Sequence, residues 1–196
     1  MKPGSLKIRL ILIAVILLAL CAFLLYFYFS YPIDSSKSNL LNAVYDQYNS
    51  GREIEQSPEI TIYDDFITIG KEEYHLLNVD GKFGSITLQK GLTGRYKITH
   101  CGYGSGDFLD GIAESSGQKY LILGGRDPYE QISTIAVELE NNTYKLHNST
   151  PEKHFLLYTK IDDSVTDNHV ERDKIELYDE KGENITHLYD LSGGGI

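Results

Sequence analysis

The chain contains an unbroken apolar run from Leu10 to Phe29, with no charged residue, no proline and no glycine. At about 1.5 Å rise per residue, a helix of this length spans roughly 30 Å, the thickness of a bilayer's hydrocarbon core. A helix is the expected conformation because every backbone polar group must be paired within lipid. The run therefore predicts one transmembrane helix, with residues 10–31 as a membrane anchor.

The charges that flank this run predict its orientation. Lys2, Lys7 and Arg9 precede it, and the first acidic residue of the chain is Asp34. Positive charge favours the cytoplasmic side, so residues 1–9 are expected in the cytoplasm and the C-terminal portion outside the cell. The expected location is the cell membrane, as a single-pass protein.

Two alternatives to an uncleaved signal anchor remain open. A cleaved signal peptide would have a shorter apolar core than this run. A bacterial lipoprotein would be lipidated at Cys21, but the preceding Leu20 is larger than that pattern requires. We favour the uncleaved anchor, and all three interpretations place the C-terminal portion on the same side.

The C-terminal portion is strongly acidic. After the anchor the chain has 15 basic and 28 acidic residues, a net charge of −13. Such a surface repels phosphates, so we expect no nucleic-acid partner and no binding of this portion to anionic lipid surfaces. Cys101 is the only cysteine after the anchor, so no intramolecular disulfide is available there. This favours a bacterial envelope protein over an animal ectodomain.

Residues 32–58 form a polar linker with one amphipathic segment. The linker's apolar residues recur at helical spacing, which predicts a short helix over residues 39–49 that packs on the following domain. Ser38 or Asn39 is placed to cap its start, and Ser50–Gly51 to end it.

From Glu59 onward the apolar residues alternate with a period of two. Short strands at nearly regular spacing, with turn signals such as Asp80–Gly81, predict an all-β extracytoplasmic domain over residues 59–190, an Ig-like β-sandwich. Whether it forms one sandwich or two packed lobes, 59–117 and 118–190, stays open. Residues 191–196 are predicted to be a flexible tail. The predicted strands are Ile60–Tyr63, Phe66–Ile69, Tyr74–Val79, Ser85–Gln89, Arg95–His100, Lys119–Leu123, Ile132–Leu139, Thr143–Leu146, His154–Lys160, Lys174–Tyr178 and Asn184–Tyr189.

The second half of this domain has a recognisable order of elements: Lys119–Asp127, Ile132–Leu139, His154–Tyr158 and the closing segment Ile175–Ile185. Together with the anchor, this order resembles uncharacterised single-pass envelope proteins of Gram-positive bacteria that have a C-terminal β-sandwich. The resemblance implies a fold and a location, and it implies no activity or cofactor.

The glycine-rich segment 102–111 is the most unusual part of the chain and is predicted to be a loop. It lacks the Gly-Lys-Ser/Thr sequence of a phosphate-binding loop. A cysteine nucleophile at Cys101 would need a base other than His100, since neighbouring strand residues point to opposite faces. Asp107 and Asp110 are candidate calcium ligands. The favoured interpretation is a glycine-rich connection between strands, with Cys101 or Phe108 packed inside.

No catalytic or cofactor-binding residues stand out elsewhere. The histidines lack zinc-ligand spacing, and the paired acids flank predicted turns. The predicted function is therefore a non-catalytic binding or accessory module of the cell envelope, with another envelope protein as partner and no identified small-molecule substrate. The alternative is an envelope enzyme or calcium-dependent module with its site in residues 102–111, using Asp107, Asp110 or His100.

Overall fold

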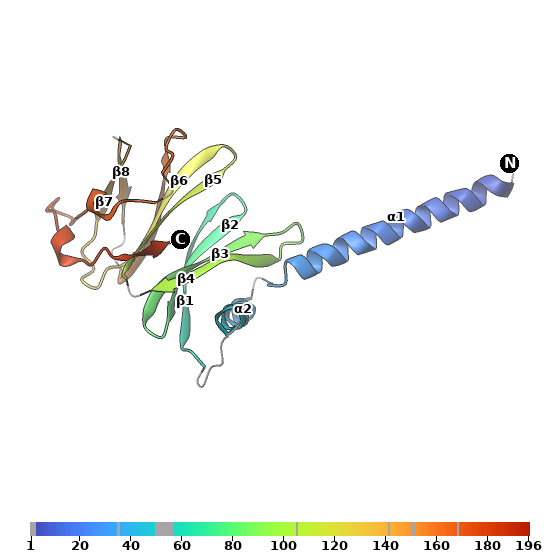
Figure 1. The fold of residues 1–196 in the computed structure, drawn as a ribbon, viewed down its shortest axis with the longest axis horizontal. Coiled ribbons are helices and arrows are strands. Elements are labelled where there is room, and N and C mark those ends of the chain that lie inside the picture. The colour runs from blue at the N-terminus through green and yellow to red at the C-terminus, as the bar shows by residue number, and fades with distance from the viewer. Residues whose placement is uncertain are drawn as a thin grey trace.

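A computed structural model describes residues 3–34, 36–49, 57–104, 106–140, 142–149, 152–167 and 169–196. The chain starts with helix α1 (Pro3–Ser30), which projects away from a β-rich head (Figure 1). Within α1, Leu10–Ser30 is long and apolar enough to cross a membrane, and its large apolar side chains other than Phe27 are exposed. The predicted helix end at Ser50–Gly51 lies outside the described residues.

The second helix, α2 (Lys37–Asn49), confirms the helix predicted in the linker. Asp34 organises its start by accepting hydrogen bonds from the backbone N–H and hydroxyl of Ser36 and from the side-chain amide of Asn39. The two residues predicted to cap the helix, Ser38 and Asn39, instead lie within its first turn, because the helix already begins at Lys37.

The head contains three sheets, followed along the chain in Figure 1. The first sheet has the order β1-β2-β3-β4, the second β11-β5-β6-β9 and the third β10-β7-β8. Two 3₁₀ turns, Arg172–Lys174 and Thr186–Leu188, connect the last strands. The strands are β1 (Ile60–Ile69), β2 (Glu72–Val79), β3 (Lys82–Lys90), β4 (Tyr96–Gly104), β5 (Phe108–Ser115), β6 (Gln118–Arg126), β7 (Thr134–Leu139), β8 (Asn142–His147), β9 (His154–Ile161), β10 (Ile175–Tyr178) and β11 (Gly193–Gly195).

The sheets stack as layers because alternate residues of each strand face opposite sides. In β2, Leu77 packs toward α2 with Leu40 and Val44, whereas Leu76 packs against Leu109 of the second sheet. The other face of the second sheet, which includes Leu121, packs on the third sheet. The all-β prediction is therefore confirmed, with three stacked sheets covered by α2 on one outer face.

The structure divides the head differently from the two predicted lobes. The first sheet ends at Gly104 and the second begins at Phe108. The predicted boundary at residues 117–118 instead falls in the tight turn of the β5–β6 hairpin, where Ser116 and Gly117 both have positive φ. Apolar clusters shared by the first and second sheets make the head one continuous stack.

Two segments depart from their predicted conformation. Residues 102–111 are mostly strand, since Gly102 and Gly104 belong to β4 and Gly111 to β5. Asn184–Tyr189 was predicted as a strand, but it contains a 3₁₀ turn because Asn184 accepts the N–H of Thr186 through its side chain.

The tail predicted to be flexible instead forms β11, which pairs in parallel with β5. Glycine permits this pairing by letting two backbones approach closely. A Cβ at Gly193 would lie 1.5 Å from the carbonyl oxygen of Phe108, and one at Gly106 would lie 2.0 Å from the carbonyl oxygen of Ser192. The two glycine-rich segments of the chain therefore pack against each other.

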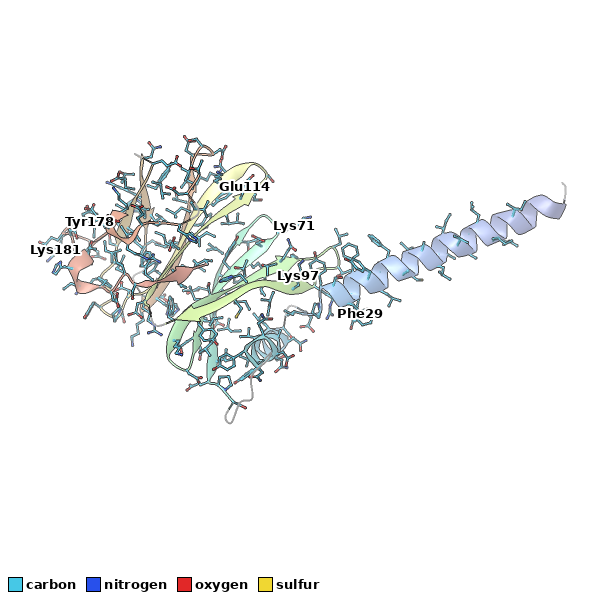
Figure 2. The ribbon with its side chains drawn as sticks, viewed as in Figure 1. Phe29, Lys71, Lys97, Glu114, Tyr178 and Lys181 are labelled. Carbon is cyan, nitrogen blue, oxygen red and sulfur yellow. The ribbon has the colours of Figure 1, made fainter. Side chains whose placement is uncertain are left out.

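The head is joined directly to the C-terminal end of α1 by hydrogen bonds. Ile33 and Tyr96 exchange backbone hydrogen bonds of 3.0 and 2.7 Å, which adds the linker to the free edge of β4. Arg95 donates from its side chain to the carbonyl oxygens of Tyr31 and Pro32. Figure 2 labels Phe29 at the end of the helix and Lys97 in the adjoining part of the first sheet.

We expect Gly193→Ala to destabilise the head by about 1–3 kcal/mol, because the new methyl group must displace the backbone at Phe108. Gly194→Ala is the matched control, since a Cβ there has no atom within 4 Å and should cost less than about 0.5 kcal/mol. Urea unfolding of the full chain in detergent measures both. Equal free energies of unfolding for the two variants would contradict the docked tail.

Candidate functional site

A pocket opens on the face of the first sheet that α2 only partly covers. In β2, Glu73 and His75 point to the same face as Leu77 and Val79. The helix covers the Leu77 end of this face, and the Glu73 end stays open as a cavity of about 290 Å³. The lining residues are Ile33, Asp34, Ser36, Leu40, Ile62, Tyr63, Asp64, Phe66, Glu73, His75, Leu88 and Tyr96.

A bulge in β1 shapes one wall of the pocket. The register between β1 and β2 shifts between Ile62 and Phe66, and this break brings Tyr63 and Asp64 to the pocket as well. Phe66 lies opposite His75 in the β1–β2 pairing, and the two rings stack with centroids 5.0 Å apart. Bulges of this kind commonly redirect side chains beside binding sites.

The polar floor of the pocket consists of Glu73, His75 and Tyr96. The side chains of His75 and Glu73 are only 11% and 17% exposed. The hydroxyl of Tyr96 donates a 2.8 Å hydrogen bond to Glu73 Oε1, while Glu73 Oε2 lies 3.8 Å from His75 Nε2. No described residue hydrogen-bonds to that buried imidazole nitrogen. The floor thus holds a shielded carboxylate and an unsatisfied ring nitrogen.

Burial sets the protonation of these groups. It lowers the pKa of His75 below 6.5, and the nearby Glu73 carboxylate offsets only part of this effect. Burial and the hydrogen bond to Glu73 raise the pKa of Tyr96 to about 12. At neutral pH the imidazole and the phenol are therefore both uncharged, and neither neutralises the charge of Glu73.

The other polar groups of the lining are few. The only hydroxyl besides the tyrosines in the described lining is that of Ser36, which donates to Asp34. No described hydrogen bond joins Ser36 to His75. A ligand with an apolar body and a hydrogen-bonding or cationic tip would match the apolar walls and the Glu73–His75 floor.

The candidate calcium ligands do not face a common space. Asp107 forms a 3.0 Å ion pair with Arg126. Asp110 is buried, and its two oxygens accept from Arg172 at 2.8 Å and from the N–H of Val170 at 2.7 Å. Protein donors therefore occupy both carboxylates, and calcium binding there stays a prediction that this geometry does not favour.

The other residues named with segment 102–111 lie in different surroundings. His100 lines a second cavity together with residues 192–195 of the tail. Neither Asp107 nor Asp110 lines this cavity. Burial raises the pKa of the Cys101 thiol, which keeps it protonated at neutral pH. Phe108 is buried in the core, as the interpretation of this segment as a strand connection expected.

One cluster in the described residues has the spacing of a metal site. Asp65, Glu152 and His154 offer ligand atoms that all lie within 4.8 Å of one another. One imidazole and two carboxylates suit a divalent metal such as zinc. Asp65 and Glu152 are exposed, and exposed acidic groups often gather without a metal, so we assign the cluster no function.

Glu73 and His75 are site residues that the sequence did not predict. From the sequence, Glu73 belongs to the paired acids that flank turns, and His75 is a strand residue rather than a metal ligand. The signal in the sequence was their spacing of two residues from Leu77 and Val79, which places two titratable groups on the apolar face of a strand.

Comparisons with models of known protein families, with curated proteins and with solved structures found no match to this chain. The site is therefore interpreted from its own geometry.

Acidification should destabilise the head through His75. Because its folded-state pKa lies below the ordinary value of 6.5, the unfolded chain takes up a proton first as the pH falls. The stability from the neutral imidazole is present above about pH 6.5 and is lost as the pH falls through the folded pKa. Urea unfolding at about pH 7 and about pH 5 should show a larger loss for the wild type than for His75→Gln. Equal losses in the two proteins would contradict this assignment.

Proposed function

We propose that the protein is a single-pass membrane protein of a Gram-positive envelope, whose head lies outside the cell and binds a basic side chain of another envelope protein without catalysis. The observation that carries this proposal is the shielded Glu73 carboxylate in the pocket, which lies beside a histidine that burial keeps neutral.

The membrane location is supported by α1. Leu10–Ser30 meets the length and apolarity of a bilayer span. Basic residues precede it and an acidic head follows it, which favours a cytoplasmic N-terminus. Ile33 and Asp34, which line the pocket, follow α1 by only a few residues. The proposed binding site would therefore lie close to the extracellular surface of the cell membrane.

The size and walls of the pocket favour one long side chain as the occupant. Its volume of about 290 Å³ is at the lower limit for sites that enclose drug-sized ligands. Ile33, Leu40 and Leu88 supply apolar walls that suit the methylene stem of lysine or arginine. The charged tip would then reach Glu73, which has one described hydrogen bond, from Tyr96. Pairing a shielded carboxylate with a cation offsets the cost of burying its charge.

A photo-crosslinking amino acid at Phe66 should capture the partner in native membranes. Phe66 is 53% exposed at the pocket wall, and Tyr129 is a matched control at 55% exposure in the third-sheet region of the head. We expect one discrete adduct from position 66 and none of that mass from position 129. No adduct at position 66, or the same adduct at both, would contradict binding at the pocket.

The charge of Glu73 should decide the strength of this capture. Glu73→Gln keeps the shape of the side chain and the hydrogen bond from Tyr96 but removes the negative charge. A hydrogen bond to a charged group contributes about 1.5–3 kcal/mol, so partner affinity should fall about tenfold or more. Glu138→Gln, on an exposed carboxylate of β7, is the control. An unchanged yield of the position-66 adduct in Glu73→Gln would exclude a basic side chain as the bound group.

A further inference from the structure

The hairpin formed by β3 and β4 differs from the rest of the head in the charge of its residues. Residues 81–106 contain four basic residues and no acidic residue, although the portion of the chain after the anchor carries a net charge of −13. Three of the four, Lys90, Arg95 and Lys97, lie at the turn end of this hairpin, close to α1. The β3–β4 hairpin is therefore a basic segment of an acidic head.

The same turn presents an apolar side chain to the outside. Leu92 is 73% exposed, the highest value among the described large apolar residues of the head. Phe29, which lies on α1 and would face lipid, is 74% exposed. An exposed leucine at the tip of a basic turn is the pattern of a segment that enters the boundary between lipid headgroups and acyl chains.

Contacts hold this turn at the depth of the last helical turn of α1. A Cβ at Gly91 would lie 2.7 Å from the ring of Tyr31, so the backbone of the turn is in close contact with that ring. The guanidinium of Arg95 lies 4.5 Å from the ring centroid of Tyr28, and Lys97 Nζ lies 5.4 Å from that of Tyr31. Aromatic rings at the end of a membrane helix favour the headgroup level, which places the turn at the same level.

We infer that the β3–β4 turn, residues 90–97, is a second membrane contact that binds anionic lipid headgroups through Lys90 and Lys97 and inserts Leu92 between them. This inference rests on the proposed function, because it requires α1 to span the membrane. It also revises the expectation that the acidic head avoids anionic lipid surfaces. Close to a membrane the local charge decides, since salt screens charges beyond about 10 Å.

The chain contains no tryptophan, so a single introduced tryptophan reports on one position. Full-length Leu92→Trp would be placed in nanodiscs whose lipids carry bromine on their acyl chains. We expect its fluorescence to be quenched and its emission to lie at shorter wavelength than that of Leu188→Trp. Leu188 is an exposed leucine whose N–H bonds to Ile185, and Ile185 bonds in turn to Leu177 of β10. Figure 2 labels Tyr178 and Lys181 at this end of the head, away from α1.

Phe23→Trp, within the apolar part of α1, separates failure of the anchor from failure of the turn. If Phe23→Trp is quenched and Leu92→Trp is not, the lipid contact of the turn is overturned while the anchor stands. If neither is quenched, α1 does not span the bilayer, and the proposed function fails together with this inference.

Lipid charge tests the role of the two lysines. Leu92→Trp should be quenched more strongly in brominated discs that contain phosphatidylglycerol than in discs of phosphatidylcholine alone. Adding Lys90→Gln and Lys97→Gln should abolish this difference, whereas Lys145→Gln and Lys181→Gln, on exposed lysines away from the turn, should preserve it. Equal quenching in both lipids, or a difference that survives loss of Lys90 and Lys97, would overturn the binding of anionic headgroups.

Discussion

The reciprocal backbone hydrogen bonds between Ile33 and Tyr96 are the constraint on which the rest of the arrangement depends. They make the first residues after α1 an extension of the first sheet. Because Ile33 is held on the edge of β4, Asp34 and Ser36 are held above the face of the sheet, where they close one side of the pocket. The same pairing keeps the β3–β4 turn against Tyr31. The linker is therefore a structural element that joins the anchor and the head.

The pocket follows from an incomplete match between a helix and a sheet. The helix α2 is only 13 residues long, and its buried Leu40 and Val44 cover part of the outer face of the first sheet. Toward the other end of that face, β2 carries Glu73 and His75 in positions that alternate with buried apolar residues. A shielded carboxylate beside a neutral imidazole is costly without a ligand, and residues of this kind tend to mark functional sites.

The sequence allowed the anchor, α2 and most strands to be predicted, because each depends on local periodicity. It did not reveal β5 and β11, because the glycine-rich segments 102–111 and 192–195 resemble a loop and a flexible tail when each is considered alone. The reason for those glycines is their mutual packing across more than 80 residues of sequence, at Gly106 and Gly193. The pocket was missed for a similar reason, since Glu73 and His75 become a site only when Ile33 and Tyr96 are brought beside them.

The central claim is that the residues after α1 are paired with the edge of β4, and hydrogen exchange of the Tyr96 amide in the full chain in nanodiscs tests it most directly. This amide donates to the carbonyl oxygen of Ile33, so its protection reports on the attachment of the linker. The account predicts that the Tyr96 amide exchanges as slowly as amides inside β3. Exchange at the rate of an unpaired peptide, while β3 stays protected, would show that the head is tethered loosely and would contradict the account.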